Sequence, residues 1–372
     1  MMNKIKVMVV FGTRPEAIKM APLVLELKKR PEIETIVCVT AQHRQMLDQV
    51  LKVFNIVPDF DLNIMQPQQT LSMITAKAMQ GIEEVIKKVE PHILLVHGDT
   101  TTSFAGALAG FYNHVKIGHV EAGLRTYNLQ SPFPEEANRV FVDTITDLYF
   151  APTKLSTENL LRENKRKDLV FVTGNTAIDA LQYTVQENYQ NEILDWAKDS
   201  RLIMLTAHRR ENLGEPMRNF FKAIKQVINE HPDVKIVYPV HLNPIVQNTA
   251  KEVFGDADRV RLIEPLNVID FHNFMNQSYL ILTDSGGVQE EAPSLGKPVL
   301  VLRDTTERPE GVKAGTLRVV GTEYEKVYAA ITELLNNQKL YQKMSNAQNP
   351  YGDGLASKRI VDTIIKYFNQ NH

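Results

Sequence analysis

Short apolar runs rich in Val, Ile and Leu alternate with longer amphipathic stretches along the whole 372-residue chain. Apolar strands joined by helical connections form parallel sheets that helices cover on both faces. The alternation therefore predicts an α/β fold. The expected strands are residues 5–11, 34–40, 92–98, 114–120, 169–174, 201–206, 234–240, 259–265, 279–284 and 298–304.

The series of strands starts afresh at residue 169, after the first four strands. A single hydrophobic core stops growing well below this chain length, so two doubly wound parallel sheets in tandem fit better than one very wide sheet. We expect an N-terminal domain over residues 1–170 and a C-terminal domain over residues 171–355. The helix expected at 356–372 is placed against the N-terminal domain.

The charges nearly balance, with 42 Lys and Arg against 44 Asp and Glu, and no long run has one sign. A surface for nucleic acid or for an anionic membrane is therefore not expected. No apolar stretch approaches the ~20 residues that cross a bilayer, and the apolar run near the amino end is too short for a signal peptide. We therefore expect a cytoplasmic protein.

The single cysteine, Cys38, lies in the apolar run TIVCVT. One cysteine excludes an internal disulfide and any metal site built from cysteines. Its apolar surroundings favour a buried, inert thiol.

The turn FGTRPEAIK follows the first strand, at the edge of the sheet where ligands of parallel sheets collect. Thr13 and Glu16 have the spacing of a capping box, and Pro15 suits the first turn of a helix. Such a turn leaves Arg14 and Lys19 unexplained, and two cations beside a helix amino end favour phosphate or another anion. The chain has neither GxGxxG before a helix nor GxxxxGK[ST], so NAD-dependent chemistry and P-loop phosphoryl transfer lose their main support.

Carboxylates follow several strands of the N-terminal half. Asp99 ends a strand where a helix would begin, and alone it is more often a helix cap than a catalyst. Glu121 follows the next strand, four residues before Arg125, and the motif SPFPEEANR adds Glu135 and Glu136. Like charges held together push one pKa upward and supply an acid and a base near neutral pH. The cluster therefore indicates acid–base chemistry.

The C-terminal half carries arginines after a strand. His208, Arg209 and Arg210 follow the strand 201–206, and two arginines at a strand end suit a phosphate group. A lone histidine is usually only a satisfied polar group. The HxxxH and HExxH patterns are absent, and no other spacing of His, Cys and carboxylates resembles a metal site.

The motif TDSGGVQEEAPSLGKP is the sharpest local signal in the chain. Ser285–Gly287 lie at a strand-to-helix turn whose backbone N–H groups can bind an anion. Glu290 or Glu291 lies one turn on and could bind a ribose diol, and Arg308 is a further partner for a pyrophosphate. The structural alternative is a tight Gly-Gly turn that only opens a helix.

The chain closely resembles the bacterial non-hydrolysing UDP-N-acetylglucosamine 2-epimerases in strings that span most of its length: FGTRPEAIKMAPL, HGDTTT, VEAGLRT, SPFPEEANR, TAHRRENLG, HLNP, TDSGGVQEEAPSLGKPVLVLRDTTERPE and YGDGLAS. The resemblance implies two Rossmann-like domains facing a cleft in the glycosyltransferase-B arrangement, and a homodimer. It implies interconversion of UDP-N-acetylglucosamine (UDP-GlcNAc) and UDP-N-acetylmannosamine (UDP-ManNAc), which supplies precursors of teichoic acid, common antigen or capsule. It further implies no nicotinamide cofactor and no metal.

The resemblance also assigns roles to individual residues. Asp99, Glu121 and Glu135 match the family's three carboxylates of proton transfer, and His208 matches its active-site histidine. Glu291 matches the ribose contact, and Leu266 and Phe271 match the uracil pocket. The full set of matched substrate and UDP contacts is Arg14, Lys19, Leu266, Phe271, Ser285, Gly286, Gly287, Glu291 and Arg308.

Many Gram-positive members of this family bind a second UDP-GlcNAc as an allosteric activator, through a segment similar to AQHRQ here. The resemblance places Gln42, His43 and Gln45 in such a site, and we add Arg209 and His241. The family also uses an arginine in the loop after the next helix, where this chain reads QPQQ at 66–69 without one. Whether an activator binds is therefore left open.

The expected chemistry follows from the weak acidity of the hydrogen on carbon 2 of the sugar. Inversion without an oxidant benefits from expelling UDP from carbon 1, which gives a 2-acetamidoglucal. UDP then adds back after protonation on the opposite face. The alternatives are a glycosyltransferase of the same architecture, a hydrolysing relative that releases free ManNAc and UDP, and a non-enzymatic sensor, against which three clustered carboxylates argue.

Overall fold

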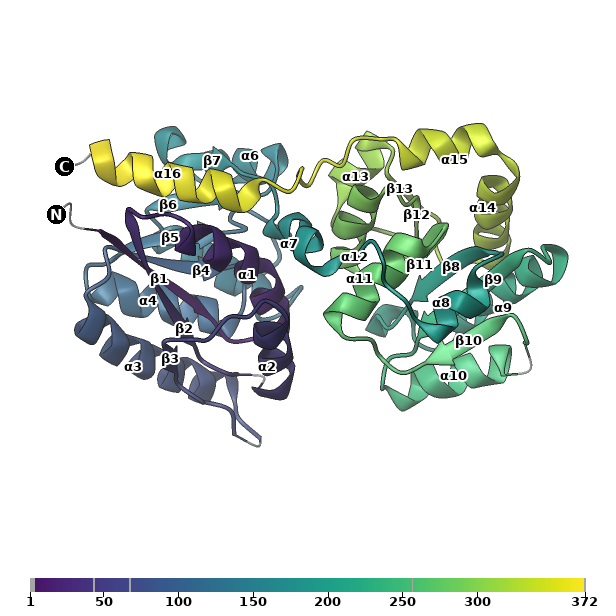
Figure 1. Cartoon of the computed structure of the whole chain (residues 1–372), viewed down its shortest axis with the longest axis horizontal. Helices are drawn as coiled ribbons and strands as arrows, with labels where there is room; N and C mark the ends of the chain where they lie inside the picture. Colours follow the sequence, from purple (N-terminus) through teal and green to yellow (C-terminus); the bar gives the residue numbers. More distant parts are fainter. Residues whose placement is uncertain (1–3, 43, 67, 256, 371–372) are drawn as a thin grey trace. The chain divides into compact units, whose positions relative to one another are not determined.

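The chain divides into two units, each built on one parallel sheet (Figure 1). The structure is a computed structural model that describes residues 4–370 apart from 43, 67 and 256. Unit 1 comprises the chain up to Tyr183 and the segment from Tyr351 onward, and unit 2 comprises Thr184–Pro350. The prediction of two doubly wound α/β sheets is confirmed.

Unit 1 has a seven-stranded sheet in the order β3-β2-β1-β4-β5-β6-β7, with every neighbouring pair parallel. Its elements are β1 (Ile5–Phe11), α1 (Arg14–Lys28), β2 (Ile33–Val39), α2 (Arg44–Val53), β3 (Phe60–Asp61), α3 (Leu71–Val89), β4 (Ile93–His97), α4 (Thr101–Tyr112), β5 (Lys116–Val120), α5 (Glu135–Ile145), β6 (Leu148–Ala151), α6 (Lys154–Arg162), β7 (Val170–Val172), α7 (Thr176–Thr184) and α16 (Ala356–Gln370).

Unit 2 has a six-stranded parallel sheet in the order β10-β9-β8-β11-β12-β13. Its elements are α8 (Glu192–Ala197), β8 (Arg201–Thr206), α9 (Glu215–Glu230), β9 (Val234–Pro239), α10 (Pro244–Phe254), β10 (Val260–Ile263), α11 (Val268–Gln277), β11 (Leu280–Thr283), α12 (Gly286–Glu291), β12 (Val299–Val301), α13 (Pro309–Ala314), β13 (Leu317–Val319), α14 (Tyr324–Asn336) and α15 (Gln338–Ser345).

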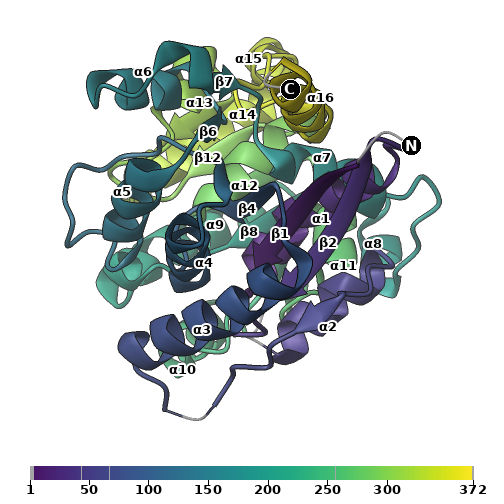
Figure 2. The same ribbon diagram turned by 90° about the vertical axis from the view of Figure 1, so that its left-hand side faces the viewer.

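Both faces of the first sheet are buried, as the continuous apolar strands predict. Side chains alternate along a strand, so Val7, Val9 and Phe11 of β1 join the core under α1 and α2, while Met8 and Val10 join the core under α3 and α4. Figure 2 shows α3 and α4 on one side of β1 and α1 and α2 on the other.

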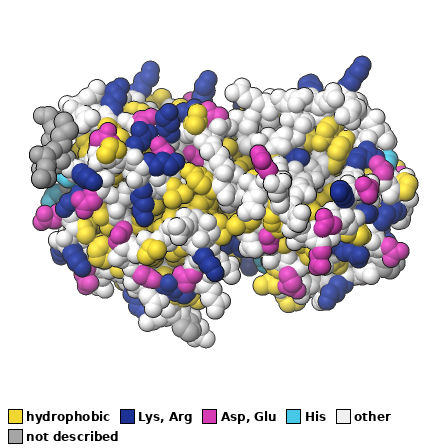
Figure 3. All heavy atoms as spheres, viewed as in Figure 1, with side chains coloured by type: hydrophobic (Ala, Val, Ile, Leu, Met, Phe, Trp, Pro, Cys, Tyr) yellow, Lys and Arg dark blue, Asp and Glu magenta, His cyan; other side chains and the backbone are white. Residues whose placement is uncertain are grey.

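The C-terminal helix α16 packs on unit 1, against α1. Its inner side is apolar, with Ile360, Val361 and Ile364 fully buried. Its outer side carries exposed Lys358 and Lys366, and Figure 3 shows Lys and Arg side chains gathered at the upper left, over this helix. The helix is therefore amphipathic and covers one face of the first sheet.

The expected boundary after residue 170 is wrong, and so is the assignment of the strand at 169–174 to the second sheet. That strand is β7, which pairs with β6 as the last strand of unit 1. The helix α7 follows it, and the division comes after Tyr183 and again before Tyr351. Three short strands, β3, β6 and β13, lie outside the expected set.

Cys38 is fully buried in β2, and burial raises the pKa of its thiol to about 12. The prediction of a buried thiol is confirmed, and the raised pKa disfavours the reactive thiolate near neutral pH. None of the helices that the structure describes is long and apolar enough to cross a membrane.

Candidate active site

In each sheet the strands are added first to one side of the first strand and then to its other side. The reversal lies between β1 and β4 in unit 1 and between β8 and β11 in unit 2. Ligands of open parallel sheets bind at the carboxyl ends of the strands at such a switch point. The segments that follow these four strands hold Arg14, Asp99, His208 and Ser285. These four predicted site residues therefore lie at the switch points of their sheets.

Glu121 follows β5 and is almost completely buried. Its carboxylate forms an ion pair with Lys19 of α1 and accepts a hydrogen bond from the Asn175 amide at 2.9 Å. Its backbone has a φ of +66°, in the left-handed region that costs a residue with a side chain. Lys19 thus contacts a carboxylate of the predicted cluster.

Asp99 follows β4, the neighbour of β5 in the sheet. Its carboxylate pairs with Arg139 of α5 at 2.5 Å, and its backbone carbonyl accepts a hydrogen bond from the Asn138 amide at 2.8 Å. Glu135 is the first residue of this helix and is half-buried. Among the described residues, none pairs with the Glu135 carboxylate.

Glu136, the neighbour of Glu135 in the motif, is fully buried. Its carboxylate accepts hydrogen bonds from the backbone N–H groups of Thr126 and Tyr127, at 2.8 and 2.9 Å, and pairs with Arg139. The second glutamate of the motif therefore holds the loop after β5 in place. A substitution there would alter the loop and is not a neutral control for Glu135.

The turn after β1 has the predicted capping box, in which Thr13 and Glu16 exchange hydrogen bonds with each other's backbone. The Glu16 carboxylate also accepts from the Gly12 N–H at 3.0 Å and from the hydroxyl of Thr100, the N-cap of α4, at 2.7 Å. Burial raises the pKa of Glu16, and these hydrogen bonds oppose that shift. Arg14 lies at this turn, and burial lowers the pKa of its guanidinium.

His97, the last residue of β4, is a buried histidine that the sequence does not single out. Its Nε2 lies 3.6 Å from the Glu121 carboxylate, and burial lowers the pKa of His97 to about 3. Glu121 opposes this shift, while Lys19 and His119 add to it. The imidazole is therefore neutral near pH 7.

We expect the stability of the protein to fall as the pH falls from about 6.5 toward 3, because the unfolded chain binds a proton at His97 in that range and the folded chain does not. From pH 7 to pH 5 this one group should cost about 2 kcal/mol. Urea unfolding at several pH values should show that loss in the wild type and a smaller one in His97→Gln. The exposed His114→Gln is the control, and equal pH dependence in all three proteins would contradict the prediction.

In unit 2 the turn Ser285–Gly287 opens the short helix α12. A Cβ atom built on Gly286 would lie 3.5 Å from a guanidinium nitrogen of Arg308 and 3.7 Å from one of Arg209. One built on Gly287 would meet no described atom within 4 Å. Two arginines thus converge on a glycine turn with open space beside it, which suits a phosphate group.

Asp284, the residue before this turn, is fully buried and fixes the loop after β8. Its carboxylate accepts hydrogen bonds from the backbone N–H groups of His208 and Arg209, at 2.9 and 2.8 Å, and from the Asn212 amide at 3.0 Å. The His208 ring stacks on His241, with centroids 5.1 Å apart. Burial lowers the pKa of His208, and His241 and Arg209 add to the effect.

The structure separates the two glutamates of α12. Glu290 is buried and forms an ion pair with Arg308, whereas Glu291 is partly exposed and lies 3.5 Å from the His272 Nε2. Glu291 is therefore the accessible one. Phe271 and Leu266 are half-buried, Phe271 in α11 and Leu266 in the loop before it.

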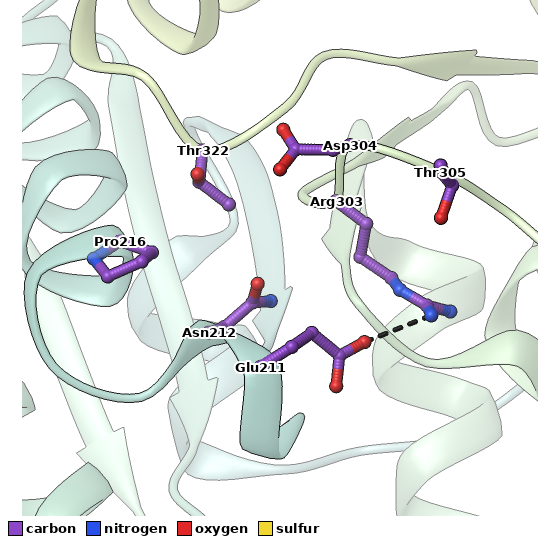
Figure 4. Close-up of a pocket in the computed structure, with 7 residues that line it drawn as sticks. All are labelled: Glu211, Asn212, Pro216, Arg303, Asp304, Thr305 and Thr322. Carbon is purple, nitrogen blue, oxygen red and sulfur yellow. Dashed lines mark ion pairs between the residues drawn. The ribbon is translucent and has the colours of Figure 1, made fainter. Parts of the chain in front are cut away.

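Close by in unit 2, a cavity of about 160 Å³ is lined by Glu211, Asn212, Pro216, Arg303, Asp304, Thr305 and Thr322. Figure 4 shows Arg303 reaching across to Glu211, with which it pairs at 2.9 Å. None of the predicted site residues lines this cavity. In the part of the chain that the structure describes, no group of three or more His, Cys, Asp or Glu side chains could hold a metal ion.

The residues assigned to an activator site lie in both units. Gln42 accepts a hydrogen bond from the Thr102 hydroxyl at 3.2 Å, and Gln45 is exposed in α2. Arg209 and His241 flank His208, as described above. His43 lies outside the described residues.

Sequence reasoning missed Asp284 and Asn175, Asp143, which accepts a hydrogen bond from the Gly123 N–H, and His97, which lies beside Glu121. Asp284 had a signal, because it ends a strand immediately before the Gly-Gly turn. The other three lie inside buried elements or in a segment expected to belong to the second domain, and no local pattern marks them.

The fold and the two strand edges define a two-domain Rossmann-like α/β enzyme. A family model described as UDP-N-acetylglucosamine 2-epimerase matches residues 25–365. The UDP-N-acetylglucosamine 2-epimerase of Bacillus subtilis is 64% identical over 99% of this chain and 97% of its own. The chain therefore belongs to the UDP-N-acetylglucosamine 2-epimerase family, in its bacterial non-hydrolysing branch.

Two solved structures agree with this. The S. aureus MnaA structure with UDP is 56% identical, covers 98% of this chain and 97% of its own, and has a TM-score of 0.90. The Neisseria meningitidis UDP-GlcNAc 2-epimerase bound to UDP-GlcNAc is 50% identical, covers 97% of this chain and 100% of its own, and has a TM-score of 0.88.

Proposed function

We propose that this enzyme interconverts UDP-GlcNAc and UDP-ManNAc by eliminating UDP and adding it back through a 2-acetamidoglucal. The observation that carries the proposal is the placement of Asp99 and Glu121 after neighbouring strands, each paired with a cation, with Glu135 at the start of α5. The names of the relatives support the substrate. Carboxylates at the carboxyl edge of the sheet can supply the base and the acid that a change of configuration at carbon 2 requires.

The glycine turn of unit 2 is proposed to hold the pyrophosphate of UDP. Arg209 and Arg308 converge on Gly286, and Arg14 stands at a helix amino end in unit 1. Cations and helix amino ends stabilise the charge that develops on the leaving pyrophosphate. Glu291 is assigned to the ribose, and Leu266 and Phe271 to the uracil, because the resemblance to the family matches them to these contacts.

His208 is proposed to contact the substrate as a neutral imidazole. Its ring stacks on His241 and its backbone N–H is held by Asp284, so its orientation is fixed. The lowered pKa of His208 keeps it uncharged at neutral pH. A neutral ring can donate or accept a hydrogen bond without adding charge beside the arginines.

We further propose a homodimer and activation by a second UDP-GlcNAc, with Gln42, His43, Gln45, Arg209 and His241 as its contacts. The exposed aromatic side chains Phe111, Tyr112 and Phe141 of α4 and α5 are in keeping with a covered surface. The loop at 66–69 lacks arginine, but Lys77 of α3 donates a hydrogen bond to Gln66 there and brings a cation to it.

The product is proposed to supply cell-surface polysaccharide.

Isotopes test the proposed mechanism with UDP-GlcNAc as the only substrate. In deuterium oxide the product should carry deuterium at carbon 2, because the returning proton comes from a different acid on the other face. An oxygen-18 label in the bridging position of the β-phosphate should scramble as the bond to carbon 1 breaks. Retention of the original hydrogen without scrambling would contradict elimination.

The same incubation separates the other functions. A hydrolysing enzyme would release free ManNAc and UDP, a glycosyltransferase would leave UDP-GlcNAc unchanged until an acceptor is added, and a sensor would never change it. An equilibrium mixture of the two UDP-sugars is the result we expect.

A further inference from the structure

A buried network of charges lies behind the carboxylate edge of unit 1. His119 of β5 and Asp143 of α5 are fully buried and in contact, with His119 Nδ1 2.6 Å from a carboxylate oxygen of Asp143. Arg125 pairs with Asp143 at 2.7 Å and with Glu163 at 2.7 Å. Charges removed from water are costly unless they are paired and hydrogen-bonded, so a network of this kind needs a reason beyond core packing.

The His119 ring holds the backbone immediately before Asp99. Its Nε2 lies 2.8 Å from the carbonyl oxygen of Gly98. A carbonyl oxygen and a carboxylate oxygen thus face the two ring nitrogens. Through these two contacts His119 joins Asp143 to the loop of Asp99. His119 and Arg125 together lower the pKa of Asp143 despite its burial.

Asp143 also holds the backbone after Glu121. Its second carboxylate oxygen accepts a hydrogen bond from the Gly123 N–H at 3.2 Å. Between Gly98 and Gly123, Glu121 has a φ of +66°, which costs a residue with a side chain. Such backbone persists where the surroundings fix it, and the hydrogen bonds at Gly98 and Gly123 do so.

The helix that carries Asp143 is the same one that begins with Glu135 and pairs with Asp99. Asn138 and Arg139 of α5 contact the backbone and the carboxylate of Asp99, respectively. One helix therefore presents one carboxylate of the cluster, contacts a second, and through Asp143 holds the backbone beside the third.

We propose that His119 and Asp143 are a positioning pair, which fixes the two loops that carry Asp99 and Glu121 for proton transfer. The pair touches no substrate and acts only through backbone atoms of Gly98 and Gly123. This inference rests on the proposed epimerase function, in which those two carboxylates move protons. Residues behind reacting groups that fix their orientation commonly affect rate by 10–100-fold.

Two substitutions test the pair. Asp143→Asn keeps the shape but removes the charge, and His119→Gln keeps a donor near Gly98 while losing the contact with Asp143. Each should lower kcat by about 10–100-fold, while KM and the dissociation constant of UDP stay within about twofold. Displaced proton donors should also release more 2-acetamidoglucal and UDP into solution per turnover, which loss of folded protein would not do.

Asp147→Asn is the matched control. Asp147 also accepts a hydrogen bond from the backbone of β5, from Ile117 N–H at 2.9 Å, and pairs with Lys116, but at the opposite end of the strand. It should retain wild-type kcat. If Asp143→Asn fails to fold, His119→Gln decides, because it leaves the pair of Asp143 with Arg125 in place.

Unchanged kcat in both variants, or a rise in KM and in the UDP dissociation constant equal to the loss of kcat, would overturn the positioning role. Wild-type protein that leaves UDP-GlcNAc unchanged would overturn the proposed function and the positioning role together. An active wild type with unaffected variants would overturn the positioning role alone.

Discussion

Asp99→Asn, Glu121→Gln and Glu135→Gln are each expected to lower kcat by about a hundredfold or more, the usual scale for loss of a proton-transfer group. Each substitution keeps the size of the side chain and removes its ability to carry a proton. Binding of UDP should survive, because its proposed contacts lie mainly around Gly286 of unit 2. Steady-state kinetics and calorimetry with UDP measure the two effects separately.

The control for these variants has to be an exposed glutamate. Glu136 is unsuitable because it holds the backbone of Thr126 and Tyr127, whereas Glu84 is exposed on α3. Glu84→Gln should retain wild-type turnover. Near-wild-type kcat in two of the three carboxylate variants would rule out the assignment of proton transfer to this cluster.

Asp284→Asn is expected to lower the free energy of unfolding by about 2–4 kcal/mol, since a neutral amide cannot accept from all the donors that the buried carboxylate serves. The N–H groups of His208 and Arg209 and the Asn212 amide now share that carboxylate. The loop that carries Arg209 should loosen, and UDP affinity should fall about tenfold, as for one lost charge-assisted contact.

Urea unfolding and calorimetry with UDP measure both consequences of Asp284→Asn. Asp304→Asn is the control in the same unit, because Asp304 is exposed and lies three residues past the end of the buried strand β12. Stability and UDP affinity equal to those of the wild type in Asp284→Asn would show that the loop does not depend on this carboxylate.

Sequence alone located the carboxyl ends of most strands, for a physical reason. Parallel strands that are buried on both faces are continuous apolar runs, so the first polar residue after such a run marks the carboxyl edge. Asp99, Glu121 and His208 all follow strands in this way, and the structure places them at that edge. The capping box of Thr13 and Glu16 was also predictable, because it depends on residues only three apart.

Contacts between distant segments could not be predicted in the same way. Asn175 reaches Glu121 from a segment that the pattern assigns to the second domain, and His119 meets Asp143 across two elements. The strand β6 was hidden because only Thr146 and Asp147 separate its four residues from the helix α5, with no Gly or Pro between them. Missing β6 in turn detached β7 from its sheet and placed the boundary too early.

The carboxylate of Glu16 has a mechanical consequence. It accepts hydrogen bonds from the N-cap backbone N–H of α1 and from the N-cap hydroxyl of α4. One carboxylate therefore links the first turns of these two helices. Arg14 projects from one turn, and Asp99 directly precedes the other. The turn of Arg14 and the segment of Asp99 are therefore joined through one buried side chain.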